Sequence, residues 1–120
     1  MKALRPPLFT LLLGLAACAT PIAGRYGLET INGDALPARF FDTEVMAAEI
    51  QLNDDGTCLI TSTERSESGV VTTGNDEGCT WTSDGAAITV TDSNGPLTGS
   101  LDNDRLTLAT QGVVFSLARR

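Results

Sequence analysis

The side chains that come first as candidates for chemistry in this chain of 120 residues are 3 cysteines and 15 carboxylates. The chain contains no histidine. Histidine is the commonest general base and the commonest zinc ligand, so its absence removes the usual routes to acid–base and zinc chemistry. A pair of carboxylates could still serve as acid and base, as in glycosidases. A cysteine could serve as a nucleophile, a redox centre, a metal ligand or half of a disulfide.

Cys18 stands at the end of a segment with the features of a secretory signal. Lys2 and Arg5 give the chain a positive start, and residues 8–17 are apolar apart from one threonine. This apolar run is shorter than the about 20 residues that a membrane-spanning helix needs. The segment is therefore expected to direct export and not to span a bilayer.

The last four residues of this segment, Leu15-Ala16-Ala17-Cys18, resemble the lipobox of bacterial lipoproteins, in which the cysteine carries diacylglycerol and becomes the mature N-terminus. The resemblance implies a signal peptide over residues 1–17 and a lipidated N-terminus with a short tether over residues 18–24. Ala19 instead of aspartate after the cysteine is similar to the sorting pattern for the outer membrane, so we expect an anchor there that faces the periplasm. The alternative is an ordinary secretory signal that is cleaved near Ala19.

Removal of the signal would make the chain more acidic. The mature chain keeps 6 arginines and all 15 acidic residues, which gives a net charge of -9, and it contains no lysine. This charge argues against nucleic-acid binding, which needs a basic face. Anionic lipid surfaces would repel the domain, so the acyl chains would hold it at the membrane.

Cys58 and Cys79 are the cysteines left once Cys18 carries lipid, and in an oxidising compartment we expect them to form a disulfide. A redox motif needs C-x-x-C spacing and a metal site needs further ligands, and the sequence offers neither. A hairpin centred on residues 66–68 would place Cys58 opposite a turn at residues 75–78. The disulfide is therefore predicted to join two strands at one rim of the fold.

Seven of the 15 carboxylates fall in clusters that are typical of turns between strands. The acidic residues of these clusters are Asp54, Asp55, Asp76, Glu77, Asp92, Asp102 and Asp104. No cluster has the spacing of a calcium-binding loop. A mature chain without lysine or histidine also lacks the usual base for a serine or cysteine nucleophile. We therefore predict that the protein is not an enzyme and has no catalytic residue, metal or cofactor.

The sequence from residue 25 onward alternates apolar and polar side chains and reaches turn-forming residues every 8–12 positions, which is typical of an antiparallel all-β domain. Turns are predicted at residues 32–33, 53–56, 66–69, 75–78, 84–85, 92–95 and 102–104. Because tight turns pair neighbouring strands, we expect an up-and-down meander of about eight to nine short strands that closes into a small barrel. Residues 25–120 would form this single domain.

Residues 37–48 form the one long connection in this pattern, and we expect either a turn of helix or a loop there. Phe40, Phe41 and Met46 could form a lid over the barrel mouth, where a small apolar ligand would enter. The alternative is that these side chains cap the core, because the ends of a small barrel must be plugged. Two further aromatic residues are candidates either for ligand contact or for the core, namely Tyr26 and Trp81.

Four short motifs resemble those of small bacterial lipocalin-like lipoproteins, which have calycin-type barrels. The motifs are Gly24-Arg25-Tyr26-Gly27-Leu28, Asn32-Gly33-Asp34-Ala35-Leu36-Pro37, Asp55-Gly56-Thr57 and Gly78-Cys79-Thr80-Trp81. The resemblance implies an eight-stranded barrel, although the mature chain is shorter than a full lipocalin and Trp81 stands where tyrosine is usual. Side chains can largely fill the interior of so small a barrel.

Two functions from different classes are compatible with the sequence. One is a lipocalin-like periplasmic lipoprotein that holds a small apolar or amphipathic ligand. The other is an envelope interaction module, such as an inhibitor of a basic hydrolase like lysozyme, because a strongly acidic domain steers cationic proteins toward itself. An apolar cavity above about 300 Å³ would favour the first function, and a filled barrel with acidic loops at one rim would favour the second. We expect a monomer in either case.

Overall fold

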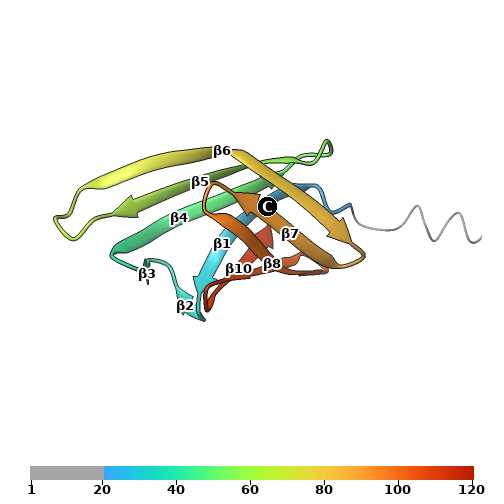
Figure 1. Ribbon diagram of the computed structural model, residues 1–120. Helices are drawn as coiled ribbons and strands as arrows, with labels where there is room; N and C mark the ends of the chain where they lie inside the picture. Colours follow the sequence, from blue (N-terminus) through green and yellow to red (C-terminus); the bar gives the residue numbers. More distant parts are fainter. Residues whose placement is uncertain (1–20) are drawn as a thin grey trace, which may run out of the picture.

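The structure is a computed structural model that describes residues 21–120, and this part of the chain is built from antiparallel β-strands without a helix (Figure 1). The predicted signal peptide, Cys18 and the first residues of the predicted tether lie outside the described residues. The strands are β1 (Gly24–Ile31), β2 (Asp34–Ala35), β3 (Ala38–Phe40), β4 (Thr43–Leu52), β5 (Thr57–Arg65), β6 (Val71–Asp84), β7 (Ala87–Asp92), β8 (Gly95–Asp102), β9 (Arg105–Thr110) and β10 (Val113–Arg119).

Eight of these strands form a closed barrel. From β4 to β10 each strand pairs with the next one in the chain, and β1 closes the barrel by pairing with β10 on one side and β4 on the other. The short strands β2 and β3 are additions that pair with β1 and β4 respectively. The prediction of an all-β, up-and-down meander that closes into a small barrel is confirmed.

The predicted loop or helical turn at residues 37–48 is wrong, because these residues form β3 and the first half of β4. Phe41 lies in the tight turn between the two strands, with a φ of 56°. A β-bulge between Val45 and Ala47 shifts the pairing of β4 with β5 by one residue. The inward positions therefore pass from Val45 to Ala48, and this break in the alternation hides the strand in the sequence.

The predicted turn at residues 75–78 is also wrong, because the 14-residue strand β6 runs through it. Cys58 pairs with Cys79 and Ile60 pairs with Asp76, so three steps along β6 match two steps along β5 at a bulge. Asn, Asp and Gly suit a bulge as well as a turn, which explains the misassignment. The Cys58–Cys79 disulfide thus joins directly paired residues of adjacent strands, with Cα atoms 4.9 Å apart, and not two strand ends at a rim.

The barrel is closed at one end and open at the other because its strands differ in length. Strand β6 begins at Val71 but pairs with β7 only from Thr80 onward. Strand β1 pairs with β4 only from Gly24 to Gly27. The sheet of β4, β5 and β6 therefore separates from the sheet of β7 to β10 and β1, and in Figure 1 its three long strands extend beyond the rest of the barrel.

The closed end, where both sheets meet, contains most of the fully buried side chains. These are contributed by five strands and include Tyr26, Leu52, Cys79, Ile88, Val90 and Leu106. The N-terminal part of the described chain is tied to the same end, since the Arg119 guanidinium donates hydrogen bonds to the carbonyl oxygens of Pro21 (2.6 Å) and Ala23 (3.2 Å). The chain therefore enters the barrel opposite the open end.

Candidate functional site

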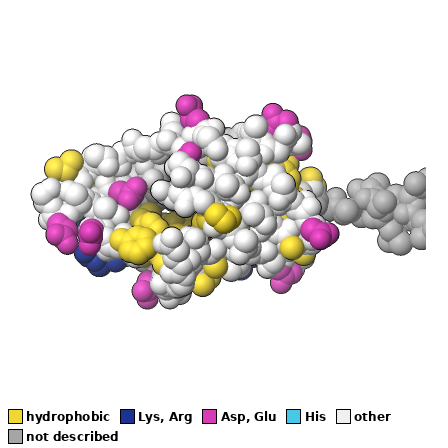
Figure 2. Space-filling view, in the orientation of Figure 1, with side chains coloured by type: hydrophobic (Ala, Val, Ile, Leu, Met, Phe, Trp, Pro, Cys, Tyr) yellow, Lys and Arg dark blue, Asp and Glu magenta, His cyan; other side chains and the backbone are white. Residues whose placement is uncertain are grey.

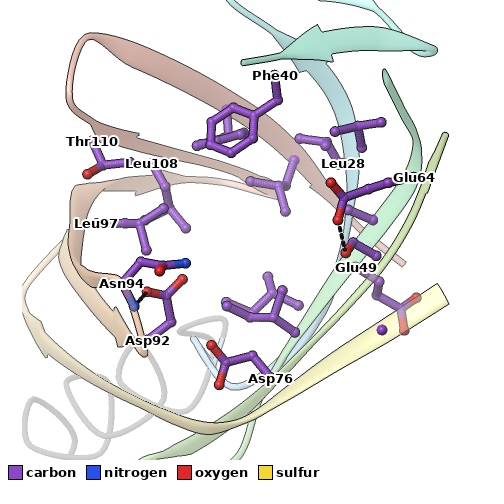
Figure 3. A pocket seen from close by; sticks show the side chains of 18 of the residues that line it. Leu28, Phe40, Glu49, Glu64, Asp76, Asp92, Asn94, Leu97, Leu108 and Thr110 are labelled. Atoms are coloured by element: carbon purple, nitrogen blue, oxygen red, sulfur yellow. Dashed lines mark hydrogen bonds between the residues drawn. The ribbon is translucent and has the colours of Figure 1, made fainter. Parts of the chain in front are cut away.

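A cavity of about 710 Å³ lies at the open end, between the two diverging sheets (Figure 3). Its apolar wall includes Leu28, Phe40, Ile60, Leu97, Leu108 and Phe115. Figure 2 shows hydrophobic side chains around a hollow in the visible face. The sequence indicated that side chains can largely fill so small a barrel and left a cavity open, and the structure is filled in this way only at the closed end. The difference in strand length separates the sheets at the other end and leaves the space open.

Phe40 and Phe41 lie together at the opening of this cavity, which we call the mouth. The two rings have centroids 4.6 Å apart, and the Phe40 ring packs against Phe115 of β10 with a centroid distance of 5.4 Å. Phe40 thus connects the two sheets on the side where β1 and β4 separate. The Phe41 side chain is 67% exposed. Met46, the third residue of the predicted lid, lies at the bulge of β4 and is not among the residues that line the cavity.

Tyr26 and Trp81 also lie away from the cavity. Tyr26 is fully buried, and its hydroxyl donates a hydrogen bond of 2.5 Å to the carbonyl oxygen of Ile22. Burial raises the pKa of this hydroxyl above its ordinary value, although the Arg119 guanidinium acts in the opposite direction. The Trp81 indole donates a hydrogen bond of 2.8 Å to the carbonyl oxygen of Asn53. The structure therefore places both aromatic residues in the packing of the closed end.

Asp76 connects the two sheets on the side of the mouth opposite Phe40. Its carboxylate accepts hydrogen bonds from the backbone N–H (3.1 Å) and the hydroxyl (2.8 Å) of Ser93, which lies in the turn between β7 and β8. These bonds span the region where the β6–β7 ladder has ended. The backbone and hydroxyl donors of Ser93 hold the pKa of Asp76 below its ordinary value, so this carboxylate is ionised at neutral pH.

Two further carboxylates, those of Glu64 and Asp92, line the cavity near the mouth (Figure 3). The Glu64 carboxylate accepts hydrogen bonds from the hydroxyls of Thr43 (2.9 Å) and Ser62 (3.2 Å). Asp92 accepts a hydrogen bond of 2.8 Å from the backbone N–H of Asn94. We refer to Glu64, Asp76 and Asp92 together as the acidic side of the mouth.

Sequence reasoning missed the acidic side because it assigned Asp76 and Asp92 to solvated turns and gave no role to Glu64. The period of two residues in a strand contained a usable signal. Every second residue of β5 lies on the same face, and this set is Cys58, Ile60, Ser62 and Glu64. If Cys58 points inward to form a disulfide, Glu64 must lie on the inner face as well. No comparable signal marks Asp76, because the bulge in β6 changes the alternation between Asp76 and Cys79.

Within residues 21–120, no three histidine, cysteine or acidic side chains lie close enough together to hold a metal ion. The same part of the chain contains no helix of the length and apolarity that crossing a membrane requires. Comparisons of the chain with protein-family models, with curated proteins and with solved structures find no match.

Proposed function

We propose that this protein is a non-enzymatic lipoprotein of the bacterial envelope whose lipocalin-like barrel holds a small apolar ligand. The cavity of about 710 Å³ with its wall of leucine, isoleucine and phenylalanine side chains carries this proposal. Ligand sites in proteins commonly have volumes of about 300–1,000 Å³, apolar walls and a few polar groups, and they favour the mouths of β-barrels.

The position of the proposed anchor supports a ligand that is exchanged with the periplasm. The carbonyl oxygens of Pro21 and Ala23 accept hydrogen bonds from Arg119 at the closed end. A lipid on Cys18 would therefore attach the barrel to the outer membrane by that end. The mouth would then face away from the bilayer. A ligand would reach the cavity from the aqueous side or from another protein, and not directly from the membrane that carries the anchor.

The alternative proposal is an envelope interaction module, such as an inhibitor of a basic hydrolase. The unpaired carboxylates at the mouth and the net charge of -9 for residues 18–120 would attract a cationic protein. A module of this kind does not need an interior space, however. The size of the cavity therefore favours ligand binding over this alternative.

Substitution of both mouth phenylalanines tests the proposed binding site. We expect a Phe40→Ser, Phe41→Ser double variant to bind the neutral fluorophore N-phenyl-1-naphthylamine at least about tenfold more weakly, because about 1.4 kcal/mol of apolar contact is lost. Fluorescence titration of residues 21–120 is suitable, since every described strand, the disulfide and the core lie within this range.

The matched control is a Val70→Ser, Val71→Ser double variant, because these valines are 57% and 54% exposed near the tip of the β5–β6 hairpin, away from the cavity. It should bind the fluorophore as the natural sequence does. Equal affinity in the two double variants would argue against a site at the mouth. Circular dichroism of each variant checks that the barrel is retained.

The proposed anchor has its own test. We expect a full-length Cys18→Ser variant to lack the lipid and to appear in the soluble periplasmic fraction, whereas a Cys58→Ser variant keeps the lipid and stays in the membrane fraction. Mass spectrometry of the mature N-terminus after membrane fractionation measures both results. Acylation of the Cys18→Ser variant, or an unmodified Cys18 in the natural protein, would contradict the proposed lipid anchor.

A further inference from the structure

We infer that the ligand of this cavity is an amphipathic organic cation, with an apolar body inside the barrel and a positively charged group at the acidic side of the mouth. This inference rests on the proposed ligand-binding function and specifies the chemistry of the ligand. It depends on three observations: the charges around the cavity, their positions relative to the aromatic wall, and their distribution around the opening.

The residues that line the cavity carry negative charge only. They include four acidic residues, Glu49, Glu64, Asp76 and Asp92, and no lysine or arginine. Glu49 is paired with Arg25 at 3.5 Å, and the described ion pairs include no partner for the other three. Three carboxylates at the edge of one apolar cavity are therefore without a protein cation within residues 21–120.

These carboxylates are held in place by hydrogen bonds from uncharged groups. Hydroxyls of Thr43 and Ser62 orient Glu64, and Ser93 orients Asp76. Hydrogen bonds from neutral donors orient these carboxylates but leave their charge uncompensated. A positively charged ligand group would find acceptors that are already oriented.

Two of these carboxylates, those of Asp76 and Asp92, face the aromatic wall across the cavity. Figure 3 shows Phe40 on one side, Asp76 and Asp92 on the opposite side, and Glu64 between them. Leu97 pairs with the fully buried Val90, and Leu108 pairs with Gly99, so both leucines lie nearer the closed end than Asp92. A ligand in this space would contact apolar groups along its body and carboxylates near one end, as an amphipathic molecule requires.

The distribution of the carboxylates favours an organic cation over a metal ion. They come from three different strands, β5, β6 and β7, and no three acidic side chains of the described chain approach one another closely enough to coordinate one ion. An ammonium or guanidinium group on an apolar body can contact one or two of the carboxylates while the body fills the cavity. A fatty acid of the same shape would place a like charge beside all three.

Three probes of equal chain length and different head groups test this inference: decylamine, decanol and decanoate. We expect residues 21–120 to bind decylamine at least tenfold more tightly than decanol, and decanol at least tenfold more tightly than decanoate. Displacement of N-phenyl-1-naphthylamine measures all three affinities in one assay. The preference for the amine should decrease as salt is raised, because ions screen charges at an open mouth.

Neutralising carboxylates of the acidic side should remove the preference for decylamine while the apolar cavity still binds decanol. In a Glu64→Gln, Asp92→Asn double variant, we expect decylamine affinity to fall about tenfold while decanol affinity stays within twofold of the natural value. Asp76 is left unchanged because its bonds to Ser93 connect the sheets. The control is an Asp84→Asn, Asp102→Asn variant, which has the same net charge but is altered at exposed positions of the closed end.

The outcomes separate the inference from the proposed function. Equal affinities for the three probes, or an amine preference that both double variants retain, would overturn the inference and leave the apolar site intact. Failure of all three probes to bind would overturn the proposed function as well. Loss of the amine preference in the mouth variant alone would support the inference.

Discussion

A chain in which Cys58 and Cys79 are both replaced by alanine should have a free energy of unfolding about 3 kcal/mol lower than the natural chain. The disulfide joins residues 21 positions apart, and closing a loop of this size in the unfolded chain contributes about 3 kcal/mol on the chain-entropy model. Both cysteines are buried in the core, with 3% and 1% of their surface exposed. Their loss therefore affects packing as well as chain entropy.

The position of the disulfide explains why its removal should also affect the cavity. Thr80, the residue after Cys79, begins the pairing of β6 with β7, and the preceding part of β6 pairs only with β5. The disulfide therefore joins β5 and β6 where their sheet begins to separate from the opposite one. We expect a less stable wall on this side of the cavity when the bond is absent.

Urea denaturation of residues 21–120 measures this effect. The control is a Thr63→Ala, Thr73→Ala variant, because these threonines are paired on the same two strands and are linked only by an exposed hydroxyl hydrogen bond of 3.0 Å. A cross-strand pair of this kind contributes about 0.2–1 kcal/mol. Equal unfolding free energies for the two double variants would show that the disulfide has no special role.

The sequence was sufficient for the strand order but not for the shape of the barrel. Tight turns such as those at Asn32–Gly33 and Asp84–Gly85 predicted neighbouring antiparallel strands, and the structure has hairpins at both places. The bulges in β4 and β6 were not predicted. The bulge in β4 breaks the apolar–polar alternation between Val45 and Ala47, and the residues at the bulge in β6 also suit a turn. Each bulge changed the assignment of a whole segment, at residues 37–48 and at residues 75–78.

The cavity could not be predicted because it depends on the difference in length between neighbouring strands and not on the pattern of any single strand. The cavity exists because the 14-residue strand β6 is paired with the 6-residue strand β7. The part of β6 that extends beyond β7 has no partner on that side within the described residues, so the two sheets separate there. The sequence pattern divided β6 into two short strands, and eight short strands of equal length would have been filled by side chains. Phe40 and Phe41 were assigned to the mouth from sequence, but the carboxylates opposite them were not.

An Ala48→Phe substitution should block the cavity and leave the barrel folded. Ala48 lines the cavity from β4, and its methyl group is partly buried against the core. A phenylalanine there would occupy space that the proposed ligand needs. Because the cavity has room for the ring, we expect the free energy of unfolding to change by less than about 1 kcal/mol, since new apolar burial offsets the cost of fixing the side chain.

The neighbouring residue provides a matched control for this substitution. Ala47 is exposed and does not line the cavity. An Ala47→Phe variant therefore adds the same ring to the same strand, outside the barrel. The two variants differ only in the face of β4 that carries the phenylalanine, so a difference in binding reports on the interior.

The most direct test of the proposed cavity is a fluorescence titration of these two variants and the natural sequence with N-phenyl-1-naphthylamine. We predict one binding site per chain in the natural sequence and in Ala47→Phe, and affinity reduced at least tenfold, or binding lost, in Ala48→Phe. Retained binding in a folded Ala48→Phe variant, or no binding by the natural sequence, would contradict the proposal that this barrel holds a ligand in its open half.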